Sequence, residues 1–141
     1  MDNYVQTRVV QLQAIHTAGY QGESLEEENR LFDQLEQAIH ESGRKITTQY
    51  LVILPGIRPL AAVDINDLGP TPAGMTSLTL PEHEYAVFQF SSRHIGQFWS
   101  EVCTDENQRK YKIDLSIPRF ELLTPDLQNA GMVEWYIPTR N

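Results

Sequence analysis

The hydrophobic positions along the chain follow two spacings, and the same order of spacings occurs twice. Segments rich in β-branched and aromatic residues, at 4–15, 46–54 and 60–65, are expected to be strands. Between the first two, apolar residues recur every three or four positions, as in an amphipathic helix: Leu31, Phe32, Leu35 and Ile39. The first half therefore predicts strand, helix, strand, strand over about residues 4–66.

The second half repeats this order after a connecting loop at 66–77 that is rich in Gly, Pro, Thr and Asn. Strands are predicted at 85–90, 111–123 and 132–138. A helix is predicted between the first two from the apolar positions Ile95, Phe98, Trp99 and Val102. We therefore expect an α+β fold in one domain, residues 1–141, with two pseudo-symmetric strand-helix-strand-strand modules at about 4–66 and 77–139. Their strands would form an antiparallel sheet with two helices packed on one side.

The boundaries of the first helix have local signals. Ser24 and Glu27 have the spacing of a capping box, and Gly43 is a candidate for the residue that ends the helix. Gly19 and Gly22 are expected to end the first strand.

Composition and charge exclude several classes of function. The 141 residues carry 11 basic and 19 acidic side chains, and the net charge of −8 argues against direct binding of a nucleic acid backbone. There is no phosphate-binding loop, dinucleotide fingerprint or His-Glu-x-x-His pair, and Cys103 is the only cysteine. We therefore expect no metal, no cofactor and no disulfide. Because the sequence has no membrane-length apolar run and no signal peptide at its start, we expect a cytoplasmic protein that does not bind membranes.

Glu121 is the most informative polar position. In an unbroken strand it would be in phase with Ile113, Leu115, Ile117 and Leu123, with Arg119 between them. A carboxylate among apolar neighbours is costly unless it is paired with Arg119, a tyrosine hydroxyl or a cationic ligand. The alternative is a solvated Glu121 near a strand end, since Pro118 could introduce a bulge that changes the phase.

Aromatic residues are frequent on the same predicted elements. Trp99 lies on the second helix, and Tyr50, Tyr85, Tyr111 and Trp135 lie on strands. These rings either pack in the core or, beside a carboxylate, form a cage for a cation.

Several short motifs resemble the GyrI-like family, the effector-binding domain of AraC- and MerR-type multidrug regulators. They comprise Pro118-Arg119-Phe120-Glu121, the turn at Pro125-Asp126, and Val133-Glu134-Trp135-Tyr136-Ile137-Pro138. The stretch from Leu80-Pro81 through Tyr85-Ala86-Val87-Phe88, followed by Phe98-Trp99, is also similar to that family. The loop Leu54-Pro55-Gly56-Ile57-Arg58 departs from the family pattern.

The resemblance implies a ligand cleft between the modules, with Glu121 at its floor. We therefore expect binding of amphipathic, cationic small molecules, with Glu121, Trp99, Tyr50, Tyr85, Tyr111 and Trp135 around the ligand. Two alternatives stay open: a hydrolase that opens strained rings, and a protein partner, as in topoisomerase inhibition. If the chain acts in transcription, another chain is expected to supply the DNA contact.

Overall fold

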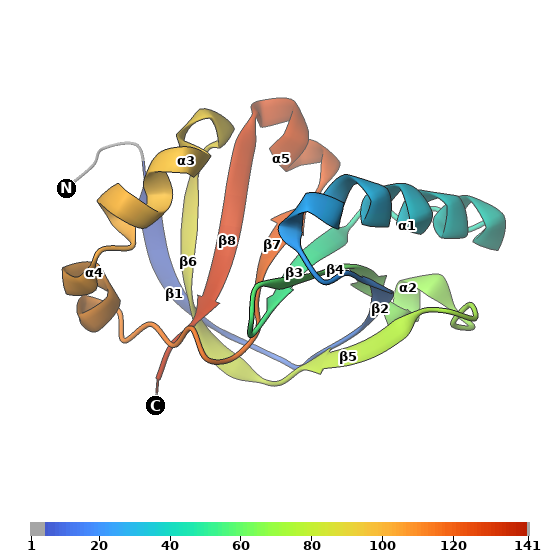
Figure 1. Ribbon diagram of the computed structural model, residues 1–141, viewed down its shortest axis with the longest axis horizontal. Helices are drawn as coiled ribbons and strands as arrows, with labels where there is room; N and C mark the ends of the chain where they lie inside the picture. The colour runs from blue at the N-terminus through green and yellow to red at the C-terminus, as the bar shows by residue number, and fades with distance from the viewer. Residues whose placement is uncertain (1–4, 141) are drawn as a thin grey trace.

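One antiparallel sheet organises the molecule (Figure 1). The computed structural model describes residues 5–140, except for the side chains of Trp99 and Val102. Within this range eight strands form the sheet in the order β1-β6-β8-β7-β3-β4-β2-β5, and all neighbouring strands are antiparallel. The strands are β1 (Gln6–Leu12), β2 (Ile15–Gln21), β3 (Gln49–Leu54), β4 (Arg58–Asp64), β5 (Thr76–Leu80), β6 (His83–Ser91), β7 (Arg119–Leu123) and β8 (Met132–Pro138).

The helices are of very different lengths. They are α1 (Glu28–Ser42), α2 (Ile65–Leu68), α3 (Ile95–Gln97), α4 (Asp105–Lys110) and α5 (Pro125–Ala130). Short 3₁₀ turns precede α1 and α3, at Leu25–Glu27 and Ser92–His94, and a π-helical turn, Phe98–Val102, continues α3. In the part of the chain described, no helix is long and apolar enough to span a bilayer.

The sheet divides into two modules of the same topology. The first contains β2, α1, β3 and β4, with β4 between the other two strands, and the second contains β6, α3, β7 and β8, with β8 in the middle. The modules meet where β3 pairs with β7. This arrangement confirms the α+β fold with two pseudo-symmetric strand-helix-strand-strand modules.

Two further strands, β1 and β5, are exchanged between the modules. β1 leads into the first module but pairs with β6 of the second, and β5 leads into the second but pairs with β2 of the first. The hydrophobic pattern along the chain did not predict this exchange. It predicted one strand at 4–15 and a loop at 66–77, because β1 and β2 are separated by only two residues and β5 carries little β-branched apolar sequence.

Gly19 does not end a strand, as the sequence suggested, but lies inside β2. β2 is flanked there by β4 and β5. A Cβ added at Gly19 would lie 1.9 Å from the carbonyl oxygen of Ala61. Glycine is therefore required by the close approach of two backbones and not by a turn.

The predicted strand at 111–123 is wrong over most of its length. Residues 105–110 form α4, Lys112 has a positive φ of 55°, and the strand starts only at Arg119. Ile113 is buried and makes a single bridge with Thr139 of the C-terminal segment. Because the chain turns between Ile113 and Arg119, the phase of Glu121 cannot be counted from the earlier apolar residues.

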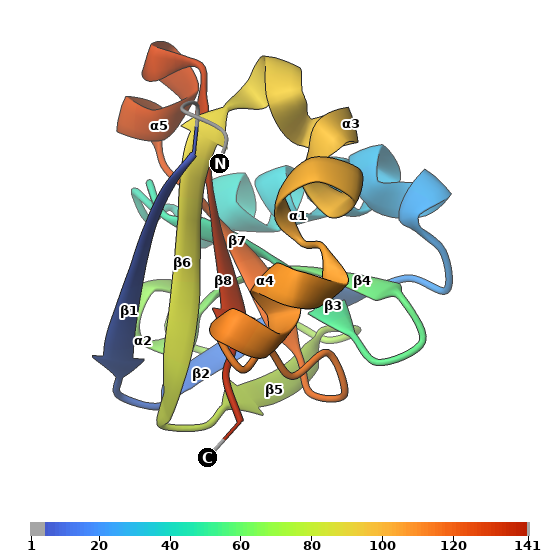
Figure 2. The same ribbon diagram turned by 90° about the vertical axis from the view of Figure 1, so that its left-hand side faces the viewer.

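Helices cover the two ends of one face of the sheet (Figure 2). At one end Leu31, Leu35 and Ile39 of α1 pack on Ala61 and Val63 of β4. As predicted, Ser24 and Glu27 form a capping box, which closes the 3₁₀ turn that leads into this helix, and the left-handed Gly43 ends the helix. At the other end, a second cluster packs the helical segment that follows β6 on β6 and β8: Phe98, Cys103, Phe88, Phe90, Val133 and Ile137. The middle strands, β3 and β7, lie between the two helical covers.

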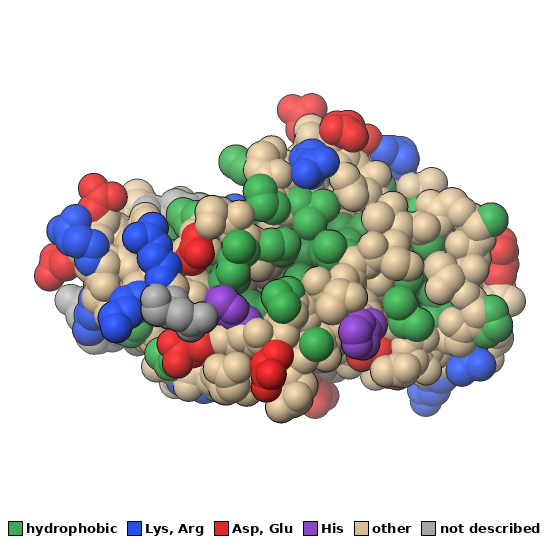
Figure 3. Space-filling view, turned by 90° about the horizontal axis from the view of Figure 1, so that it is seen from below, with side chains coloured by type: hydrophobic (Ala, Val, Ile, Leu, Met, Phe, Trp, Pro, Cys, Tyr) green, Lys and Arg blue, Asp and Glu red, His purple; other side chains and the backbone are tan. Residues whose placement is uncertain are grey.

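The opposite face of the sheet encloses an aromatic cluster. The rings of Phe120 and Tyr136 are stacked with centroids 4.6 Å apart, and Tyr85 packs edge-on against Phe120 at 5.5 Å. The view from below shows hydrophobic side chains gathered across the middle of the molecule (Figure 3). Several members of this cluster are only partly buried: Val10, Leu12, Ile15, Tyr50, Leu78 and Leu122.

We predict that Gly19→Ala destabilises the protein by about 2–3 kcal/mol, because the strands must separate to admit the methyl group. Gly96→Ala in α3 is the matched control, since a Cβ there meets no atom within 4 Å. The control should be neutral or stabilising by up to about 1 kcal/mol. Denaturant unfolding of both variants measures the difference, and equal stabilities would contradict the backbone approach seen at Gly19.

Candidate functional site

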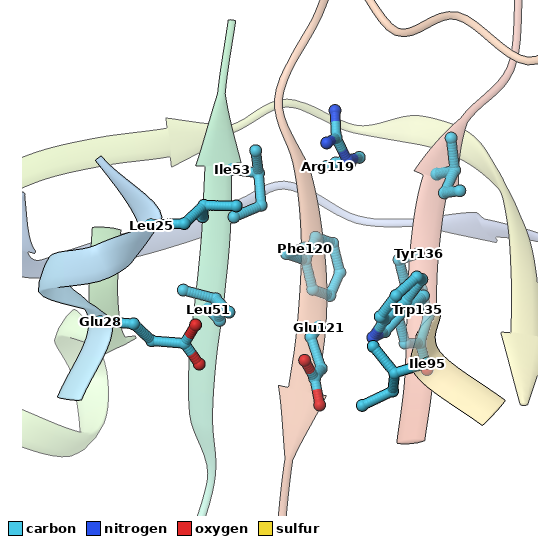
Figure 4. Close-up of a pocket in the computed structure, with 11 residues that line it drawn as sticks. Leu25, Glu28, Leu51, Ile53, Ile95, Arg119, Phe120, Glu121, Trp135 and Tyr136 are labelled. Atoms are coloured by element: carbon cyan, nitrogen blue, oxygen red, sulfur yellow. The ribbon is translucent and has the colours of Figure 1, made fainter. Parts of the chain in front are cut away.

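An open cavity of about 270 Å³ lies on the helix-bearing face of the sheet, over β3, β7 and β8 (Figure 4). The starts of the helical segments of both modules form its rim. Its lining is mostly apolar and includes three charged side chains: Leu25, Glu28, Leu51, Ile53, Ile95, Arg119, Phe120, Glu121, Trp135, Tyr136 and Ile137. The rings of Phe120 and Tyr136 lie behind the strands, on the other side of the sheet (Figure 4).

Glu121 lies on the floor of this cavity because of its position in β7. It pairs across the sheet with Leu51 of β3 on one side and with Trp135 of β8 on the other. Since side chains alternate along a strand, Phe120 points into the aromatic cluster of the opposite face while Glu121 points into the cavity. The indole N–H of Trp135 donates a hydrogen bond to the Glu121 carboxylate.

The environment of Glu121 disfavours its ionised form. The pKa of Glu121 is raised to about 7, chiefly by burial and to a smaller extent by the nearby carboxylate of Glu28, while the Trp135 hydrogen bond opposes the shift. Burial also raises the pKa of Glu28, which is the first residue of α1. Two carboxyl groups on different elements therefore lie at the same cavity, and the pKa of each is raised above its usual value.

Two exposed apolar side chains form opposite parts of the rim. Leu25 is 46% exposed and Ile95 is 40% exposed, although both are large hydrophobic residues. Each lies four residues beyond the end of a strand, Leu25 after β2 and Ile95 after β6. The two modules thus contribute equivalent positions, and the apolar rim is left in contact with solvent.

Arg119 brings the opposite charge to the cavity. It is two residues before Glu121 on β7, so both side chains leave the same face of the strand. Partial burial lowers the pKa of Arg119, with an electrostatic contribution from Cys103 in the other direction. Sequence reasoning considered Arg119 only as a partner for Glu121, and it missed Glu28, because a first-turn glutamate is usually part of a solvated helix start.

The residues predicted around the ligand are distributed over several environments. Trp135 lines the cavity with Glu121, whereas Tyr50 and Tyr85 pack against Phe120 on the opposite face of the sheet. Tyr111 packs edge-on against Phe88 within the second module. The side chain of Trp99 lies outside the described part of the structure. Tyr50, Tyr85 and Tyr111 therefore do not line the cavity that contains Glu121, because of strand parity for the first two and of the turn after α4 for the third.

Residues 8–139 match the model of the family described as integron-associated effector binding protein. The chain belongs to this family. The resemblance of the sequence to GyrI-like effector-binding domains is thereby confirmed. No functionally curated protein matches the sequence.

Solved structures of low sequence identity share the fold. The C-terminal domain of EcmrR superposes with a TM-score of 0.72 at 10% identity, over 97% of this chain and 98% of that one. An integron cassette protein of Vibrio cholerae gives 0.63 at 13% identity, over 99% and 100%. SAV2435 bound to tetraphenylphosphonium gives 0.61 at 16% identity, over 96% and 94%.

The raised pKa of Glu121 predicts a cost in stability. Between pH 4.5, the reference value, and about 7 the folded state binds more protons than the unfolded state, so the free energy of unfolding falls as pH rises. Glu121→Gln removes this contribution and should stabilise the protein by about 1–2 kcal/mol above pH 7, and by much less below pH 4.5. Denaturant unfolding across this pH range measures it, with Glu82→Gln in the exposed turn before β6 as control. A variant less stable than the parent at pH 8 would contradict the prediction.

Proposed function

We propose that the protein binds amphipathic, cationic organic molecules in the cavity above β3, β7 and β8, with Glu121 as the anionic anchor. The observation that carries this proposal is a desolvated carboxylate on the floor of an open, mostly apolar cavity. An unpaired carboxylate in such surroundings is costly, and a bound cation offsets that cost. Glu28 adds a second carboxyl group on the α1 side.

The apolar part of the cavity provides the rest of the binding energy. Leu51, Ile53 and Ile137 cover the walls and floor, while the indole of Trp135 offers an aromatic surface for a cation. A ligand that rests against Leu25 and Ile95 would remove two exposed hydrophobic side chains from water. A mostly apolar lining with a few polar groups is typical of sites for small organic ligands.

Family membership supports the same proposal. The description of the family is that of an effector-binding protein, and SAV2435 has been solved with the lipophilic cation tetraphenylphosphonium. That ligand is a suitable first probe, because it has no titratable group and no hydrogen-bond donor. Its binding would therefore depend on the apolar walls and on the charged side chains that line the cavity.

We predict that Glu121→Gln weakens binding of tetraphenylphosphonium by one to three orders of magnitude, on the order of 1.4 kcal/mol per decade. Binding of triphenylphosphine oxide, a neutral molecule with similar rings, should change by less than about threefold, because only the charge of the anchor is lost. Quenching of tryptophan fluorescence or calorimetry measures both affinities.

Glu82→Gln has the same charge change on an exposed turn and should leave both affinities unaltered. Equal losses for the cation and the neutral ligand in Glu121→Gln would indicate a change of cavity shape. No loss for either would remove Glu121 from the site.

The affinity for tetraphenylphosphonium should also depend on pH. With a pKa of about 7, Glu121 is mostly protonated at pH 6 and mostly ionised at pH 8. Since the cation favours the ionised form, the parent should bind about tenfold more tightly at pH 8 than at pH 6. The charged groups that share the cavity are Glu28 and Arg119, so any pH dependence that remains in Glu121→Gln reports on Glu28. A parent affinity that is flat between pH 6 and 8 would contradict an anchor with this pKa.

A further inference from the structure

The cavity contains a cationic side chain as well as its two carboxyl groups. We propose that its preferred ligands are zwitterions: amphipathic molecules with a cationic group for Glu121 and an anionic group, such as a carboxylate, for Arg119. This inference rests on the proposed function and deepens it by naming the class of ligand. It is carried by the placement of Arg119 and Glu121 along one face of β7.

The two charges lie at opposite ends of the cavity. Along the β3–β7 pairing, Arg119 is opposite Ile53 and Glu121 is opposite Leu51. Two residues of strand separate their backbones by about 7 Å. In the close-up, the guanidinium of Arg119 and the carboxylate of Glu121 point away from each other along the strand (Figure 4).

The residues around each charged side chain increase the difference between the two ends of the cavity. At one end Glu28 approaches from α1, so the Glu121 end of the cavity is doubly acidic. At the other end Arg119 is flanked by the apolar side chain of Ile53. Partial burial of the Arg119 guanidinium means that an anion placed there meets a charge that is less well solvated than one on the open surface.

A ligand with only a positive charge can interact favourably with Glu121 but not with Arg119. If its body extends along β7 from the Glu121 end, its far end lies beside a like charge, which reduces its affinity. A carboxylate at that far end would instead accept hydrogen bonds from the guanidinium, whose planar fork matches a carboxylate. The separation of the side chains calls for ligand charges at least about 7 Å apart on an apolar, ring-containing body.

A matched pair of dyes tests the inference: a cationic rhodamine methyl ester and the corresponding free acid, which is zwitterionic at neutral pH. They share the same ring system and differ only at the carboxyl group. Fluorescence anisotropy gives the affinity of each for the parent, Arg119→Gln and Glu121→Gln. Arg109→Gln is the control, because Arg109 is an exposed arginine of α4 that does not line this cavity.

We expect Arg119→Gln to weaken the acid by about tenfold or more, and to leave the ester unchanged or bound more tightly. Glu121→Gln should weaken both dyes by similar factors, and Arg109→Gln should affect neither. Ile53→Glu is an independent variant that places a competing carboxylate opposite Arg119. It should lower the affinity for the acid relative to the ester, even if Arg119→Gln proves too unstable to study.

The possible failures are distinguishable. If the ester binds the parent through Glu121 but neither Arg119→Gln nor Ile53→Glu changes the ratio of the two affinities, the zwitterion inference is overturned and the proposed function stands. If both variants weaken the two dyes equally, Arg119 shapes the cavity without contacting the ligand's anionic group, and the inference is again overturned. If neither dye binds the parent, the proposed function fails as well.

Discussion

The pairing of β3 with β7 is the constraint on which the rest of the structure depends. It joins two modules of the same topology side by side in one sheet, and each module carries its helical cover at its outer end. The central strands are consequently free of helix on one face, while their other face is closed by the aromatic cluster around Phe120 and Tyr136. An open cavity over the module junction follows from this topology. The exchange of β1 and β5 reinforces the junction, because each module supplies an edge strand to the other.

A cavity of this kind destabilises the folded state, and interactions elsewhere in the fold must offset that cost. Glu121 is held near an apolar surface, and Leu25 and Ile95 keep hydrophobic area in water. The interactions that offset this cost in stability lie around the cavity and not within it. The capping box fixes the 3₁₀ turn that carries Leu25 and leads into Glu28 of α1. The stacked rings of Phe120 and Tyr136 hold β7 and β8 together from the opposite face of the sheet. The site is therefore a locally unfavourable region supported by a well-packed frame.

Features that depend on residues close together in the sequence could be predicted from the sequence. Features that depend on contacts with segments far away in the sequence could not. The period of α1, its capping box and the left-handed Gly43 are local properties, and all three are present in the structure. By contrast, Gly19 was interpreted as a strand end because its contact with Ala61 depends on a strand some forty residues away. The strand that was predicted from residue 111 is interrupted by a turn whose apolar residue, Ile113, is buried by the C-terminal segment. The aromatic residues share this ambiguity, since composition does not tell which face of a sheet Tyr50 or Tyr85 occupies.

The two modules are alike in topology but differ in the chemistry of their central strands. Leu51 of β3 and Glu121 of β7 face each other across the junction, and the same interval along the chain relates Leu25 to Ile95 on the rim. A symmetric pair of modules would give a cavity with two equivalent halves. Here β3 contributes Leu51 and Ile53, while β7 contributes Glu121 and Arg119. The two central strands therefore contribute different chemistry to the cavity floor, and the β7 part of that floor has an acidic end and a basic end. Under the proposed function, a bound molecule would meet a different environment in each direction, so a single orientation would be favoured although the scaffold is nearly symmetric.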